Sequence, residues 1–147
     1  MASFMALVLA PLDSSQAFSL FGKFKKVEPV DGQVRLALKD FDDGQARFYT
    51  YTHGKSRIRF FVLKSSDGIV RAAFDACDVC YRAGKGYRQD GGVMVCVNCG
   101  MRFDSRRINV VSGGCNPAPL ERTVQGDHLV IEISDIEAGA RFFPEGV

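Results

Sequence analysis

Four cysteines stand in two Cys-x-x-Cys pairs, Cys77 with Cys80 and Cys96 with Cys99, and fifteen residues separate the pairs. Two residues between thiols allow a tight turn to aim both sulfur atoms at one point. A second such turn brought close by a β-hairpin supplies the other half of a sulfur cage. Thiolates are soft ligands that select zinc or iron, as a single ion or as an iron–sulfur cluster. The spacing therefore predicts a metal site.

A fifth cysteine, Cys115, lies in a Gly-Gly-Cys-Asn-Pro stretch at positions 113–117. Two glycines before it and a proline after it indicate a tight, irregular loop that could pass over the metal site. Cys115 could be a further ligand, a ligand to a second metal or a redox thiol. The alternative is a small buried residue under a turn. We include it among the predicted metal ligands.

The elements that must position these cysteines have the pattern of β-strands. Short runs alternate polar and apolar residues or are continuously apolar, and Gly-rich turns separate them. Strands are predicted over 34–38, 46–51, 57–63, 69–74, 93–95, 108–111 and 128–133. Segments 83–87 and 89–92 are predicted to be loops, and 136–143 one or two helical turns. The expected fold is all-β, a small sandwich or barrel whose Cys-x-x-Cys loops form the metal site.

Composition excludes some classes of function. A formal net charge of +2 over 147 residues gives no electrostatic basis for binding nucleic acid. No P-loop, dinucleotide-binding glycine pattern or Ser-His-Asp grouping is visible. His53 and His128, the two histidines, are assigned to the surface or to strands rather than to a ligand set. These features favour an electron carrier or metal-binding protein over a stand-alone enzyme.

The first residues differ from the rest of the chain. Positions 4–12 form an apolar run, and Ser15-x-Ala17 resembles the cleavage site of a signal peptide. We therefore divide the chain into a signal-like or anchor-remnant segment at 1–17 and a single metal-binding β domain at 18–147. Export places the cysteines where disulfides form, so two disulfides and a free thiol are the alternative to metal. Five cysteines of which four lie within 23 residues favour metal.

Four short motifs together resemble a known family. They are FDACDVC at 74–80, KGY at 85–87, MVCVNCG at 94–100 and GGCNP at 113–117. In this combination, between about Arg57 and Phe143, the chain resembles the FtrD-like membrane iron–sulfur proteins. The resemblance implies an exported or membrane-anchored domain in the periplasm or cell envelope, with metal on the four paired cysteines. It also implies redox support of iron transport, with a membrane metal permease or a redox protein as partner.

A more distant likeness is to Rieske domains. The stretch Cys96-x-x-Cys99-Gly100-x-x-Phe103-Asp104 is similar to the second cluster-binding loop of that fold. Cys80 and Cys99 stand where Rieske proteins have histidines. This likeness implies a β fold and an all-thiolate centre, which has a lower reduction potential than a His-ligated one.

Three functions remain open on this reading. The first is a redox module with iron or an iron–sulfur cluster that transfers single electrons. The second is a binding module that holds zinc or copper for structure, delivery or docking. The third is a thiol–disulfide protein, which is disfavoured because no thioredoxin-like βαβ pattern is present.

Overall fold

The computed structural model describes residues 22–145 of the chain. The signal-like segment predicted at 1–17 lies outside the described residues, so its role stays a prediction. The described part is mostly β-sheet with one short α-helix, which confirms the all-β fold class. Within this part, no helix combines the length and the apolar character needed to cross a membrane.

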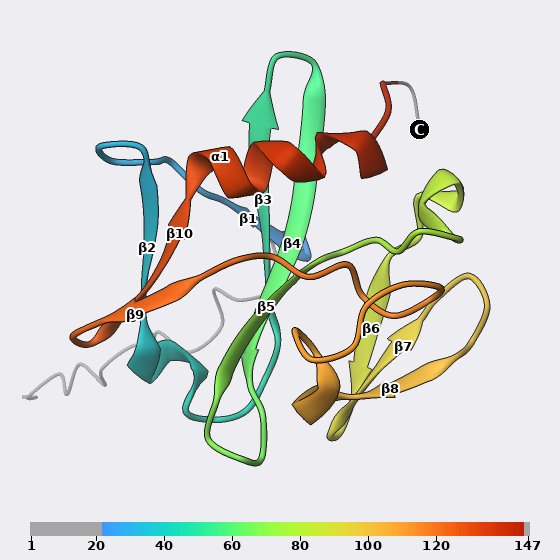
Figure 1. The fold of residues 1–147 in the computed structure, drawn as a ribbon, viewed down its shortest axis with the longest axis horizontal. Coiled ribbons are helices and arrows are strands. Elements are labelled where there is room, and N and C mark those ends of the chain that lie inside the picture. The colour runs from blue at the N-terminus through green and yellow to red at the C-terminus, as the bar shows by residue number, and fades with distance from the viewer. Residues whose placement is uncertain (1–21, 146–147) are drawn as a thin grey trace, which may run out of the picture.

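The strands form three small sheets that lie side by side (Figure 1). The middle sheet has the order β1-β3-β4-β5, with β1 at Phe24–Lys26, β3 at Arg47–His53, β4 at Ser56–Lys64 and β5 at Val70–Phe74. A second sheet has the order β2-β10-β9, with β2 at Gln33–Ala37, β9 at Thr123–Gln125 and β10 at His128–Glu132. The third has the order β6-β7-β8, with β6 at Tyr87–Asp90, β7 at Val93–Cys96 and β8 at Arg102–Asp104.

Strand β4 separates two hydrophobic cores because both of its faces are buried. Ile58 and Phe60 point into a core shared with the second sheet and with α1, which spans Ile133–Ala138. Phe61 and Leu63, on the opposite face, point into a smaller core against the third sheet. Successive side chains of a strand alternate between faces, so the continuous apolar run in β4 serves both cores.

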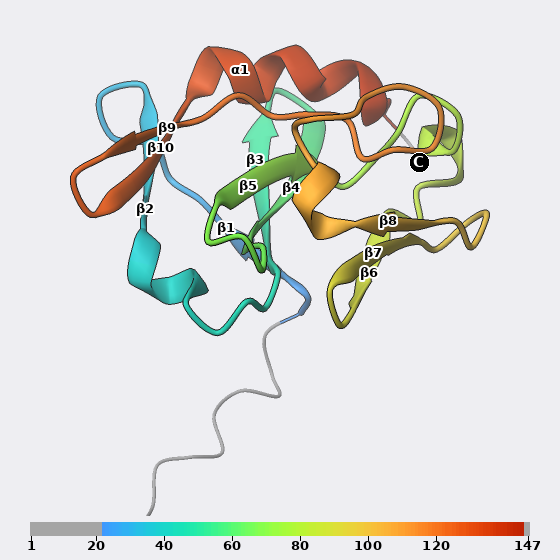
Figure 2. The ribbon, with the colours of Figure 1, turned by 60° about the horizontal axis from the view of Figure 1, so that its bottom comes forward.

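The smaller core holds the cysteines. Cys77 and Cys96 are buried in it, together with Tyr87 and Met94, and Cys80 and Cys115 pack against it. The main core lies elsewhere, under α1 and the 3-10 turn η5 at Gly139–Phe142, which cover one end of the sheets in both views (Figure 2). The cysteine region is thus attached to the larger body of the protein through β4 and β5.

Several predicted elements need correction. Segment 108–111 is a turn rather than a strand, because Asn109 has the left-handed backbone angle φ 64°. Residues 87–90 form strand β6, although Tyr87, Gln89 and Asp90 were assigned to loops. Helix α1 begins at Ile133, within the predicted last strand and before the predicted helical turns.

Candidate metal centre

The first cysteine turn continues directly from β5. Cys77 follows the strand by three residues and is buried, whereas Cys80 is half-buried. The backbone amide of Cys80 donates a hydrogen bond to Cys77 Sγ at 3.1 Å. The 3-10 turn η3, Tyr81–Ala83, then carries the chain away from the site. An amide pointed at a sulfur stabilises its thiolate form, which is the form that binds metal.

The second cysteine turn comes from a hairpin, as the sequence predicted. Strand β6 pairs with β7 so that Tyr87 lies opposite Cys96, at the end of β7. Cys96 is buried and Cys99 is exposed. Gly100 follows at φ 75°, and its amide donates to the carbonyl of Cys96 at 2.8 Å. A left-handed residue at this position closes the turn, and glycine adopts that conformation without strain.

The two turns converge. The sulfur atoms of Cys77, Cys80 and Cys96 all lie within 4.8 Å of one another. Those of Cys80, Cys99 and Cys115 form a second group within the same limit. We call them the inner and outer thiol groups; Cys80 belongs to both. The five cysteines named from the sequence are therefore brought together, while their role as metal ligands stays a prediction.

The loop that carries Cys115 is held against β5 by backbone pairing. The Ala118 amide donates to the carbonyl of Ala76 at 3.0 Å, and the Phe74 amide donates to the carbonyl of Ala118 at 2.8 Å. Tyr87, buried in the smaller core, donates its hydroxyl to the carbonyl of Cys115 at 2.5 Å. Burial raises the pKa of Tyr87, so the hydroxyl keeps its proton and remains a donor. These bonds place Cys115 beside the first cysteine turn.

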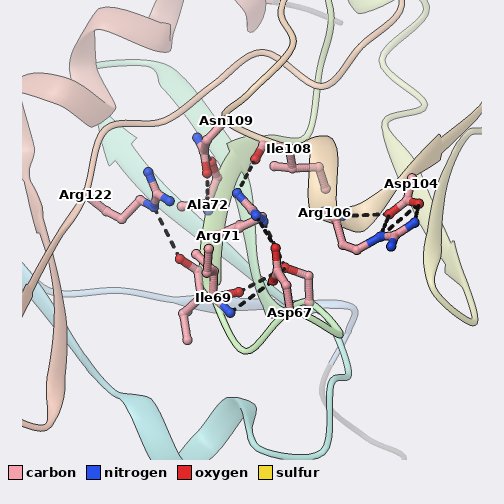
Figure 3. A network of polar contacts seen from close by, with 11 residues as sticks. Asp67, Ile69, Arg71, Ala72, Asp104, Arg106, Ile108, Asn109 and Arg122 are labelled. Atoms are coloured by element: carbon pink, nitrogen blue, oxygen red, sulfur yellow. Dashed lines mark hydrogen bonds and ion pairs between the residues drawn. The ribbon is translucent and has the colours of Figure 1, made fainter.

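Side chains extend this attachment along β5 (Figure 3). Asn109 acts as a substitute strand residue: its Oδ1 accepts from the Ala72 amide at 3.1 Å, and its Nδ2 donates to the Ala72 carbonyl at 2.7 Å. The buried Arg71 donates to Asp67 at 2.6 Å and to the carbonyl of Ile108 at 3.0 Å. Together these contacts fix the start of the segment that leads to Cys115.

Asp75 links the two cysteine turns, a role that the sequence did not reveal. In the structure it is buried, and its Oδ1 accepts from the Tyr87 amide at 2.7 Å. A Cβ on Gly86 would lie 2.1 Å from the Asp75 carboxylate, so only glycine fits there. The only sign of this contact in the sequence is that the motifs FDACDVC at 74–80 and KGY at 85–87, which contain Asp75 and Gly86-Tyr87, occur together.

Two cations face the same carboxylate. Lys23 Nζ lies 3.9 Å and Arg59 Nε 4.0 Å from Asp75 Oδ2. Burial raises the pKa of Asp75 to about 6, and the two cations and the Tyr87 amide only partly oppose that effect. Because the Oδ2 atom has no hydrogen-bond partner among the described residues, the ionic contacts are long-range rather than direct. Asp75 therefore acts chiefly through its bond to Tyr87.

The thiols differ in how readily they ionise. Burial raises the pKa of Cys96 to about 11 and that of Cys115 to about 12. The backbone amide of Met101 lowers the pKa of the exposed Cys99. Metal ions bind thiolates and displace these protons, so metal binding at the buried thiols depends on pH.

The donor set fits a metal centre. Sulfur atoms around a tetrahedral ion with bonds of about 2.3 Å lie about 3.8 Å apart, and Cys80 Sγ lies 3.9 Å from Cys115 Sγ. All five cysteines are free thiols. The histidines lie apart from this cluster, His53 against Glu137 at 2.8 Å and His128 against Asp127 at 2.6 Å. Among the described residues, the groups of at least three potential ligands consist of cysteine alone.

Comparison with known proteins agrees with this site. Neither the curated proteins nor the solved structures gave a significant match, so the Rieske likeness stays a prediction. The family model described as "Membrane iron-sulfur containing protein FtrD-like" matches residues 41–143, a range that includes all five cysteines. The chain therefore belongs to the FtrD-like family of membrane iron–sulfur containing proteins.

Proposed function

We propose that this chain is a redox module of the cell envelope that transfers single electrons through an iron centre held by its cysteines. The electrons support the transport of iron by a membrane permease, reached directly or through a redox partner protein. The observation that carries the proposal is the convergence of five thiols from three segments, in a chain of an iron–sulfur family.

The position of the thiols supports electron transfer. Cys77 and Cys96 are buried, so solvent does not reach them, while Cys99 is exposed. An iron centre bound to these thiols supplies one-electron redox chemistry at a potential set by burial and by hydrogen bonds to sulfur. Cys99 then offers a short route between the centre and a protein that docks on the surface.

Apolar side chains beside the cysteines support docking of a protein partner. Val79 lies within the first turn, Val97 within the second, and Met101 follows the second; they are 63%, 45% and 53% exposed. Exposed apolar groups near one another are typical of surfaces that contact other proteins or membranes. Val97 and Met101 stand two residues before and two residues after Cys99, the one exposed thiol of the five.

A second candidate is a zinc or copper module with a structural or delivery role. The 3.9 Å separation of Cys80 and Cys115 supports it as well as it supports iron, because this value is close to that of sulfurs sharing one tetrahedral ion. Zinc cannot transfer electrons, so the two candidates differ in a property that is easily measured.

The test is anaerobic purification of the chain, followed by elemental analysis and spectroscopy. The proposal predicts bound iron, visible absorption that bleaches on reduction, and reversible oxidation at a defined potential. A Cys99→Ser variant that still binds iron should exchange electrons more slowly with a soluble acceptor. Colourless protein that contains zinc and shows no redox transition contradicts the proposal and supports the second candidate.

A further inference from the structure

A pocket of about 300 Å³ lies where three distant segments of the chain meet: the β3–β4 hairpin, the η3 turn and the chain from the end of η5 onward. The η3 turn and the end of η5 lie side by side in both views (Figures 1 and 2), and the ring centres of Tyr81 and Phe142 are 6.0 Å apart. Because Tyr81 follows Cys80 directly, the pocket adjoins the first cysteine turn. Its lining includes Lys55, Arg57, Arg59, Tyr81, Phe143 and Glu145.

The cations of the pocket come from the beginning of strand β4. Arg57 and Arg59 stand two positions apart in this strand, so they lie on the same face. Farther along β4 that face carries Phe61 and Leu63, which belong to the smaller core. Lys55, in the turn before β4, adds a third cation to the lining. The face of β4 that packs against the cysteine region therefore becomes cationic where the core ends.

Arg59 is already fixed in position. Its Nη2 donates a hydrogen bond to the carbonyl of Gly84, the residue after η3, at 2.9 Å. The central carbon of its guanidinium lies 5.4 Å from the centre of the Phe143 ring, and its side chain is 25% exposed. A guanidinium has five N–H donors, so the bond to Gly84 leaves donors for a ligand. A ligand that binds a side chain held in this way immobilises little else, which lowers the cost of binding.

Positive charge around the pocket exceeds negative charge. Lys55 Nζ lies 4.0 Å from Oε2 of Glu145, the carboxylate that lines the pocket. Arg57 has no ion-pair partner within residues 22–145. Arg59 faces Asp75 at 4.0 Å, but that carboxylate also faces a lysine outside the pocket at 3.9 Å. These four cations and two carboxylates leave two positive charges uncompensated, so an anion with two negative charges balances the pocket.

We infer that this pocket binds a small anion that carries two or three carboxylate groups. A guanidinium presents paired N–H donors that match the two oxygens of a carboxylate. Residues two positions apart in a strand are separated by about 6.8 Å, so Arg57 and Arg59 present separate forks, one for each carboxylate. The pocket has about the volume of ten water molecules. A di- or tricarboxylate fills that volume, whereas a single phosphate fills only part of it.

Titration calorimetry of the purified chain tests the inference at about 0.15 M salt, where long-range attraction between exposed charges is screened. The probes are glutarate and propane-1,2,3-tricarboxylate, and acetate, with its single carboxylate, is the comparison. We expect at least one of the two polycarboxylates to bind with a dissociation constant of about 1 mM or lower, and about tenfold or more tightly than acetate. Absence of binding, or equal binding of acetate, overturns the inference.

A pair of variants separates the pocket from general attraction to positive charge. Arg57→Gln removes one guanidinium fork from an exposed position and should weaken polycarboxylate binding about tenfold or more. Arg88→Gln is the matched control, because Arg88 on β6 is also exposed, lies outside the pocket lining and carries the same charge. It should bind the probes as the wild type does. Equal weakening in both variants contradicts a specific site.

Sedimentation with phosphatidylglycerol vesicles distinguishes a soluble anion from a lipid headgroup. Vesicle binding that Arg57→Gln abolishes, in a chain that binds neither polycarboxylate, assigns the pocket to a phosphate headgroup and overturns the inference. Polycarboxylate binding that depends on Arg57, without such vesicle binding, supports it. These measurements do not involve the metal centre, so their failure leaves the proposed electron transfer to be judged by bound iron and its redox transition.

Discussion

The two cysteine turns have the same Cys-x-x-Cys spacing, but they are attached to different strands. The first follows a strand of the middle sheet and continues into the η3 turn, and its Cys80 belongs to both thiol groups. The second ends a hairpin, closes through Gly100, and divides its sulfurs, with Cys96 in the inner group and Cys99 in the outer. Equal motifs therefore do not imply equal roles, because the attached strands decide where each sulfur lies.

The largest difference should appear when the last cysteine of each turn is replaced. Cys80→Ser removes a sulfur from both thiol groups, whereas Cys99→Ser removes an exposed one from the outer group only. Because metal binding contributes directly to folding free energy, Cys80→Ser should lower the free energy of unfolding by roughly several kcal/mol, and Cys99→Ser by clearly less.

Urea unfolding of both variants, with and without a chelator, measures this difference. The chelator should abolish most of it, because the metal is its source. Equal destabilisation by the two substitutions would show that Cys80 has no special position between the groups.

A smaller effect is expected at Asp75, the connection between the turns. Asp75→Ala leaves the buried Tyr87 amide without its acceptor, which costs about 1–3 kcal/mol of unfolding free energy. Asp75→Asn keeps a carbonyl oxygen in place and should cost less. If Asn proves as harmful as Ala in urea unfolding, the attraction to Lys23 and Arg59 outweighs the hydrogen bond.

Local patterns in the sequence were enough to predict three strands of the middle sheet, β3, β4 and β5, and the strand β7 that ends at Cys96. The run at 57–63 predicted a strand, and β4 lies there with side chains in both cores. The alternation and turn residues on which these predictions depend act between neighbours in the chain.

The failures have a common physical cause. Segment 108–111 has the composition of a strand, yet Asn109 pairs with β5 through its side chain rather than its backbone. This side-chain pairing depends on Ala72, a strand residue 37 positions away in the chain. Local composition carries no information about such a distant partner. Asp75 is a similar case, because its partner, the Tyr87 amide, becomes visible only when the two turns are folded together.

The smallest predicted effect concerns how the Cys115 loop depends on the smaller core. Tyr87→Phe removes the hydroxyl that donates to the Cys115 carbonyl, at a cost of about 1 kcal/mol in unfolding free energy. The loss should be local: amide hydrogen exchange at Asn116, whose amide bonds to Gly113 within the loop, should accelerate more than exchange in β4. Tyr49→Phe is the matched control, since Tyr49 is also buried and its hydroxyl has no partner among the described residues. If both variants change exchange at Asn116 equally, the Tyr87 hydroxyl does not hold the loop, and the backbone pairing with β5 alone positions Cys115.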